Sequence, residues 1–214
     1  MYMPPQFNAT DPAIALSLMR AHPFASLVSN DDEGLPFVSH LPLVARQEEG
    51  GQLVLLGHCA KPNPHWRYLQ ARPRAVVTFL GPHSYLSPSV YPDLARVPTW
   101  NYLAVHCTVE ARLIEEPAAK DALLKTLIGK HEPGYAQQWR DLGEEFQLKM
   151  LAGIVGFALR VDQLQCKVKL NQHRRESHAA MHAVYSAGTG DEKALAMWME
   201  RLGMTAGTAA TEGH

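Results

Sequence analysis

The segment GHCAKPNPHW, residues 57–66, brings a lysine, two histidines and an amide together within ten positions. We predict that it joins the end of a strand to the start of a helix. Free backbone N–H groups and the helix dipole favour anions at such a point. Lys61 would add a point charge, and His58 and Asn63 would add hydrogen-bond donors. The segment therefore predicts a phosphate-binding turn that is not a Walker loop, because the GxxxxGK[ST] spacing is absent. A proline-stiffened turn with an exposed lysine is the alternative.

Ser39 and His40 are neighbours in the segment VSHLPL, residues 38–43. Successive side chains of a strand point to opposite faces, so one of the two must face the interior or an interface. This strand could turn a polar side chain toward a ligand. A hydroxyl bonded to its own backbone is the alternative.

Two stretches rich in proline and aromatic residues, GPHSYLSPSVY and VPTWNY, cover residues 81–91 and 97–102. Neither alternates like an ordinary strand, so we expect both to connect strands. Ring faces such as that of Trp100 and polar groups such as Asn101 could line a slot for a flat heteroaromatic ligand. A proline-rich loop that packs its rings onto the core is the alternative.

The segment KVKLNQHRRESH, residues 167–178, places Lys167 and Lys169 on one face of an expected strand and follows them with Gln172. These groups could bind a phosphate, contact nucleic acid or form a solvated basic edge.

Metal and nucleophile sites are not predicted. His178 and His182 have the spacing that puts two imidazoles on one helix face, but no third ligand has suitable spacing and HExxH is absent. No GxSxG is present and no cysteine has a recognisable nucleophile context. Catalytic residues are therefore left unassigned.

Hydrophobic periodicity and turn residues predict a mainly β protein with about seven strands and short peripheral helices, an antiparallel β-barrel. The first three strands are joined by tight turns and should form a meander. The strands are expected at residues 24–30, 35–47, 52–59, 74–81, 102–116, 154–161 and 164–170. The helices are expected at residues 12–22, 61–72, 117–128 (closed by Gly129), 135–151, 174–188 and 191–203.

Composition is that of an ordinary globular protein, with 46% hydrophobic and 19% charged residues among 214 and a net charge of −1. A near-neutral charge argues against strong nonspecific binding to DNA. The three cysteines form no CxxC pair, which favours a reducing, cytoplasmic compartment. The start lacks the pattern of a signal peptide, and no apolar run approaches the roughly 20 residues of a membrane span.

The segments MYMPPQF, VSHLPL, GHCAKPNPHWR, GPHSYLSPSVY, VPTWNYLAVH and VKLNQHR occur in this order, and together they closely resemble the PaiB family of FMN-binding negative transcriptional regulators. The resemblance runs from residue 1 to about residue 202. It implies an FMN-binding split β-barrel of the pyridoxamine-phosphate-oxidase-like type, and a homodimer with the flavin at the subunit interface. We accordingly expect a flavin-binding domain at residues 1–170, a helical extension packing on it at 171–203, and a flexible tail at 204–214.

The resemblance also implies roles for single residues. Lys61 fits the basic residue that binds the FMN phosphate, the strand with Ser39 and His40 would line the flavin and ribityl chain, and Trp100 with Asn101 would approach the ring, from the partner subunit. The expected cofactor-binding residues are Ser39, His40, His58, Lys61, Asn63, Trp100, Asn101, Lys169 and Gln172.

The chain departs from the family's usual residues at three of these positions or their neighbours. Lys61 replaces an arginine, and a lysine neutralises a phosphate without the bidentate guanidinium fork. Asn171 and His173 stand where the family has serine and asparagine.

Three functions follow from these observations. The first is a flavin-binding regulator that represses transcription indirectly, because the sequence has no helix-turn-helix and no basic recognition helix. The second is an FMN-dependent oxidoreductase with a reduced nicotinamide donor and a small-molecule substrate. The third, a haem-binding split barrel, is supported by the histidines alone.

Overall fold

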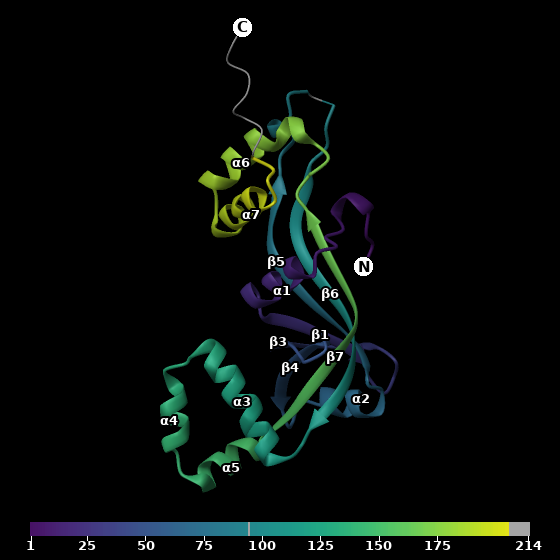
Figure 1. Ribbon diagram of the computed structural model, residues 1–214. Coiled ribbons are helices and arrows are strands. Elements are labelled where there is room, and N and C mark those ends of the chain that lie inside the picture. The colour runs from purple at the N-terminus through teal and green to yellow at the C-terminus, as the bar shows by residue number, and fades with distance from the viewer. Residues whose placement is uncertain (94, 206–214) are drawn as a thin grey trace. The chain divides into compact units, whose positions relative to one another are not determined.

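The computed structural model describes residues 1–93 and 95–205 (Figure 1). The tail expected at residues 204–214 lies outside the described residues from residue 206 onward. Seven strands form one sheet: β1 (Phe24–Asn30), β2 (Pro36–Pro42), β3 (Val44–Gln47), β4 (Leu53–Ala60), β5 (Arg74–Leu86), β6 (Thr99–Ile114) and β7 (Ile154–Lys169). The α-helices of the described residues are α1 (Pro12–Ala21), α2 (His65–Ala71), α3 (Pro117–His131), α4 (Tyr135–Asp141), α5 (Glu144–Ala152), α6 (His178–Ala187) and α7 (Gly190–Arg201). Short 3₁₀ turns cover Pro5–Phe7, Pro88–Val90 and Arg175–Ser177.

The strand order is β2-β1-β5-β6-β7-β4-β3, so the expected number of strands is confirmed. Both antiparallel pairings of the expected meander are present, but its middle strand is divided between the two edges of the sheet. Residues 35–47 do not form one strand, because the chain breaks at Leu43, after a proline that lacks the N–H of a ladder residue. The Leu43 N–H instead donates to the Pro23 carbonyl at 2.9 Å. As a result β2 pairs with β1, and β3 pairs with β4.

The two aromatic stretches are largely strand, so the expectation that they connect strands is wrong. The strand β5 continues through Gly81 and Pro82 to Leu86, and β6 already begins at Thr99. From His83 to Leu86 the side chains alternate between exposed and buried, which is the period of a strand. The two strands expected at 154–161 and 164–170 are likewise one continuous strand, β7.

The helices follow their expected start signals more closely than their expected ends. The Asp11 carboxylate accepts from the Ala13 N–H at 2.9 Å where α1 begins. Gly129 does not end α3, which continues to His131, and residues 135–151 form two helices with a break at Leu142 and Gly143. Among the described residues, no helix is long and apolar enough to cross a membrane.

The chain divides into two compact units. Unit 1 comprises Met1–Leu18, Leu80–Val105 and the described residues from Gln165 onward, and unit 2 comprises Met19–Phe79 and His106–Leu164. The long strands β5, β6 and β7 contribute residues to both units. The boundaries expected at residues 170 and 203 stay a prediction.

Unit 2 contains the shorter strands, α2 and the helices α3, α4 and α5. In this unit α3 packs against α4, α5 and β4 (Figure 1). The contact with β4 buries Val54 and Leu56 of the strand against Leu123 and Leu127 of α3. This apolar cluster covers the strand that ends just before Lys61.

In unit 1, α6 and α7 lie side by side (Figure 1). Both helices were expected, and α7 begins with a capping box in which Thr189 and Glu192 each satisfy a backbone N–H of the other. Glu192 also accepts from the Ser84 hydroxyl of β5 at 2.9 Å. The side chains of Met181 and Tyr185 on α6 are buried in this unit.

Gly57 of β4 provides a test of the packing next to the candidate site. A Cβ atom at this position would lie 2.4 Å from Leu43 Cδ2 and 3.2 Å from Phe157 Cε2, both in the core. We expect Gly57→Ala to lower the free energy of unfolding by about 1–3 kcal/mol, measured as a shift of the urea midpoint. Gly129→Ala in α3, where a Cβ meets nothing within 4 Å, should raise it by up to about 1 kcal/mol. An unchanged midpoint for Gly57→Ala would contradict this packing.

Candidate functional site

Ser39 and His40 of β2 point to opposite faces, as the alternation of a strand predicts. Ser39 is buried and His40 is exposed. The buried face carries the hydroxyl toward α2, which packs against both β1 and β2.

The Ser39 hydroxyl is the centre of a hydrogen-bonded cluster in unit 2. The Asn63 side-chain amide donates to Ser39 Oγ at 3.0 Å, and His65 Nδ1 lies 2.8 Å from the same oxygen. The His65 backbone N–H in turn donates to Asn63 Oδ1 at 3.0 Å. If Ser39 donates its hydrogen to His65 Nδ1, the hydroxyl, the Asn63 amide and Nδ1 are all paired. The cluster therefore ties β2 to the turn that precedes α2.

His65 is the least exposed polar group of this cluster, with 1% of its surface accessible. The Phe37 ring packs against its imidazole in a T-shaped arrangement with the centroids 5.1 Å apart. Burial lowers the pKa of His65 from 6.5 to about 4, so the ring is neutral at physiological pH. Its Nε2 atom is buried and has no hydrogen-bond partner among the residues that the structure describes.

Lys61 lies in the turn itself, four residues before the start of α2. Its backbone is held at both ends, because its N–H donates to the Gly153 carbonyl at 2.8 Å and its carbonyl accepts from Trp66 Nε1 at 3.0 Å. The side chain is exposed, and its ammonium group has no hydrogen bond or ion pair with any described residue. A positive charge is thus held on a fixed backbone and left open to solvent.

The other two predicted residues of unit 2 flank this cluster. His58 of β4 is half-buried, burial lowers its pKa, and its buried Nδ1 lacks a partner among the described residues. His40 Nδ1 lies 3.0 Å from Ser26 Oγ, and the ring stacks on Phe24 with centroids 6.2 Å apart.

The donor set of unit 2 fits a phosphorylated cofactor. The structure brings Ser39 and Asn63 into direct contact and places Lys61 on the turn that Asn63 fixes. The exposed Lys61 ammonium group can bind a phosphate, and the partly buried Asn63 amide keeps a second N–H besides the one that it donates to Ser39. The other predicted site residues, Trp100, Asn101, Lys169 and Gln172, belong to unit 1.

In unit 1, Trp100 is exposed to 55% and has two rings beside it. The His83 and Tyr85 rings of β5 each lie 6.3 Å from the Trp100 ring, the tyrosine in a T-shaped arrangement. This aromatic group is open to solvent and can take a flat ring.

Asn101 points to the opposite face and is completely buried. Its amide nitrogen donates to the Tyr185 hydroxyl at 2.9 Å and lies 3.2 Å from Met181 Sδ. Burial raises the pKa of Tyr185 to about 12, so the phenol stays protonated. These contacts fasten β6 to α6, and a contact of Asn101 with a cofactor stays a prediction.

Lys169 and Gln172 lie at the end of β7 and just after it. The Lys169 ammonium group donates to Thr99 Oγ1 at 2.6 Å. Both ends of the Gln172 amide bind backbone, its oxygen accepting from the Leu170 N–H and its nitrogen donating to the Val168 carbonyl. Gln172 therefore shapes the end of the strand, and its expected contact with a cofactor is also untested.

Two of the three departures from the family pattern, Asn171 and His173, make local contacts in unit 1. Asn171 has a φ of +56°, a left-handed conformation that asparagine adopts more readily than most residues, and its amide donates to the Tyr91 hydroxyl at 2.7 Å. His173 packs against the Phe7 ring at 5.7 Å, and burial lowers its pKa.

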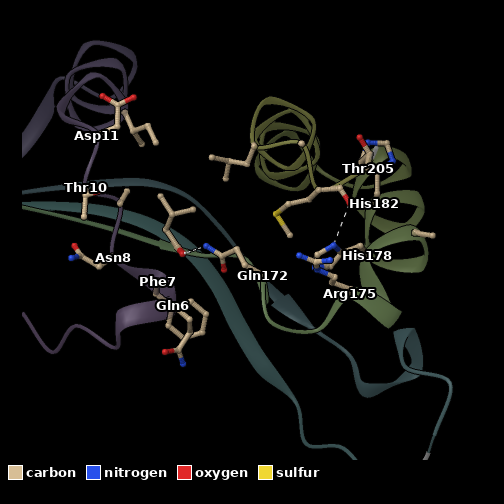
Figure 2. Close-up of a pocket in the computed structure, with 17 residues that line it drawn as sticks. Gln6, Phe7, Asn8, Thr10, Asp11, Gln172, Arg175, His178, His182 and Thr205 are labelled. Atoms are coloured by element: carbon tan, nitrogen blue, oxygen red, sulfur yellow. Dashed lines mark hydrogen bonds between the residues drawn. The ribbon is translucent and has the colours of Figure 1, made fainter. Parts of the chain in front are cut away.

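Unit 1 also has a cavity of about 950 Å³ between the N-terminal segment and α6 (Figure 2). Of the predicted site residues, Gln172 lines it. The ring nitrogens of His178 lie 3.2 and 3.1 Å from the carbonyl oxygens of Met204 and Asn171, and His182 Nε2 pairs with Glu200 at 2.7 Å. No group of three or more His, Cys, Asp or Glu that could hold a metal occurs among the described residues.

Sequence reasoning missed the part that His65 plays. Its contact with Ser39 spans 26 positions, and no local spacing signals it. The position of His65 inside GHCAKPNPHW was the one available sign. The structure adds Phe37 as its ring neighbour, again through a contact that only the pairing of β2 with β1 and α2 creates.

Comparison with known proteins assigns the family. The family model described as "Putative FMN-binding domain" matches residues 1–163. The "Protease synthase and sporulation protein PAI 2" of Bacillus subtilis (strain 168) is 33% identical over 179 residues, which cover 83% of this chain and 84% of that protein.

Two solved structures show the same fold at low identity. The flavocytochrome Anf3 from Azotobacter vinelandii has a TM-score of 0.63 at 17% identity, covering 78% of this chain and 71% of that one. The FAD and heme binding protein from Mycobacterium smegmatis has a TM-score of 0.60 at 18% identity, covering 76% and 73%. With the strand order, these likenesses confirm the expected fold class, an antiparallel split β-barrel with peripheral helices. By its match to the FMN-binding domain model and its identity to PAI 2, the chain belongs to the PaiB family.

Proposed function

We propose that this protein binds FMN through the turn at Lys61 and regulates transcription indirectly as a flavoprotein. The observation that carries the proposal is the state of Lys61. Its backbone is fixed on both sides, and its charge has no partner among the described residues. Because the backbone is already fixed, only the lysine side chain has to be ordered when it binds a phosphate.

The neighbouring residues would hold the rest of the cofactor. His58 and Asn63 flank Lys61 in the chain, and Ser39 braces the turn from β2. FMN, when bound, would supply one- or two-electron redox chemistry. The protein's own contribution would be to bind the phosphate and to hold the turn with the neutral His65–Ser39 pair.

The regulatory part of the proposal rests on the family to which the chain belongs. The net charge of −1 disfavours direct, sequence-independent binding to DNA. Repression through a metabolite or a protein partner fits this charge better. The buried thiols of Cys59, Cys107 and Cys166 suit a reducing cytoplasm, where we place the protein.

The proposal includes a homodimer formed through the outer face of β1, β2 and β5 in unit 2. Val38 pairs with Val28, which pairs with Val76, so these side chains share a face. Phe24 and Val38 on it are exposed to 67% and 46%. His40 lies on the same face and would reach a flavin held between two copies. Exposed apolar patches of this kind mark association sites.

Lys61→Ala should raise the dissociation constant for FMN by about 10–100-fold, because a charge-assisted phosphate contact is lost. Riboflavin, which has no phosphate, should bind the wild type and the variant equally. Quenching of flavin fluorescence measures both, and Lys61→Arg should retain FMN binding. Lys149→Ala, which removes an exposed charge from α5, is the matched control.

Equal FMN binding by wild type and Lys61→Ala would contradict the phosphate assignment. The absorption spectrum separates the alternatives, because a Soret band would indicate haem instead of flavin. Oxidation of NADH that depends on added FMN would favour the oxidoreductase over the regulator.

The buried His65 should make stability depend on pH. The pKa of His65 is about 4 in the folded protein, against an ordinary value of 6.5. Between pH 4 and pH 6.5 this histidine is therefore protonated in the unfolded chain and neutral in the folded protein. The free energy of unfolding should therefore fall as pH decreases through this window, by up to about 1.4 kcal/mol per pH unit. His65→Gln should lose this contribution while other histidines keep theirs. Identical slopes for both proteins in urea titrations from pH 7 to 4 would rule it out.

Val38→Glu should convert the dimer to a monomer by placing a charge on the shared apolar face, weakening association by about tenfold or more. Val184→Glu on the exposed side of α6 is the control and should leave the mass unchanged. Sedimentation velocity over a range of concentrations measures both. A dimer that both variants retain, or a monomeric wild type, would contradict this interface.

A further inference from the structure

One face of unit 1 gathers two lysines around a tyrosine. Lys167 and Lys169 of β7 lie two residues apart on one face of the strand, and Tyr102 of β6 lies beside them. The Lys167 and Lys169 ammonium groups are 5.3 and 5.9 Å from the Tyr102 ring centroid. Lys167 is also 5.5 Å from the Tyr2 ring and donates to the Tyr2 carbonyl at 3.0 Å.

These two positive charges have no negative partner. Neither lysine contacts a carboxylate among the described residues. Lys167 is only 6% exposed, and its contacts are one carbonyl and two ring faces. Burial lowers the pKa of Lys169, and the neighbouring Lys167 charge acts in the same direction. A buried charge without a counter-ion is costly, so an anion bound here would be stabilised.

The same face continues into exposed aromatic rings. Trp100 lies two residues before Tyr102 on β6, and alternation puts both on one face while the buried Asn101 faces the other. The His83 and Tyr85 rings stand beside Trp100. Exposed ring faces therefore lie next to lysines that lack a counter-ion, within one unit.

We propose that Lys169 and Lys167, with the ring faces of Tyr102 and Trp100, form a second ligand site that takes a phosphate-bearing planar aromatic molecule of the nucleotide class. Lys169 is the charge that meets the phosphate, because it is half-buried while Lys167 is enclosed. Lys167 acts as a positioning residue that holds Tyr2 and Tyr102 and adds positive potential. Trp100 supplies a face on which a base or ring stacks.

All residues of this site belong to unit 1, whereas Lys61 of the proposed FMN phosphate site belongs to unit 2. It does not depend on that proposal, since its lysines, rings and missing counter-ions are all observed within unit 1. Its small number of cations suits a mononucleotide better than a nucleic-acid strand, which needs a track of positive charge.

Adenosine 5′-monophosphate and adenosine are the probes, titrated calorimetrically into the full-length protein. The monophosphate should bind at least about tenfold more tightly than the nucleoside, and Lys169→Gln should remove that difference. Trp100→Ala should weaken both probes. Lys193→Gln, which removes an exposed charge from α7 in the same unit, should change neither. Equal affinity for the two probes, or no binding of either, overturns the proposal.

Protection of Lys169 from acetylation, read by mass spectrometry, tests the location of the site in the unsubstituted protein. Adenosine 5′-monophosphate should protect Lys169 in the wild type and equally in Lys61→Ala. Protection by FMN alone that disappears in Lys61→Ala would mean that the flavin bound at Lys61 covers this lysine, and the second site would be refuted. A failure of FMN to bind at all would refute the Lys61 proposal and leave this one standing if the monophosphate still protects.

Discussion

The Ser39 hydroxyl is the constraint on which the candidate site depends. It is buried between β2 and α2, and it is the common partner of the Asn63 amide and the His65 ring. A buried donor or acceptor that loses its partner costs the full desolvation of that group. Removing this one oxygen would leave both the Asn63 amide and the His65 ring without that hydrogen-bond partner. The turn that carries Lys61 is therefore held by a polar contact inside an otherwise apolar layer, with Phe37 closing over His65.

Much of the fold could be predicted where the signal is local. The strand Phe24–Asn30 and the opposite facing of Ser39 and His40 follow from a period of two. The start of α1 follows from an aspartate before a proline, and α7 follows from its apolar stripe. Each of these depends on residues within one or two turns of one another.

The failures have two physical causes. Glycine at position 81 and proline at position 82 are typical of loops, yet β5 includes both and continues to Leu86, because its contacts with neighbouring strands outweigh the local preference. Contacts between distant residues were the second cause. The Ser39–His65 and Asn101–Tyr185 bonds join elements 26 and 84 positions apart, and only the packed sheet and helices define them. Asn101 and Trp100 are adjacent residues of one strand and serve opposite faces, and the expected contact of Asn101 with a cofactor stays a prediction.

The two units hold positive charge in different ways, and this difference bears on what each can bind. Lys61 is solvated, so its charge is cheap to maintain, and its contribution to binding comes from a backbone that is already fixed. Lys167 is enclosed, and its ammonium group meets the Tyr2 carbonyl and two ring faces where a carboxylate is lacking. A ligand at the first position gains mainly from preorganisation. A ligand at the second would supply the negative partner that Lys167 and Lys169 lack among the described residues, next to ring faces on which its planar part can stack.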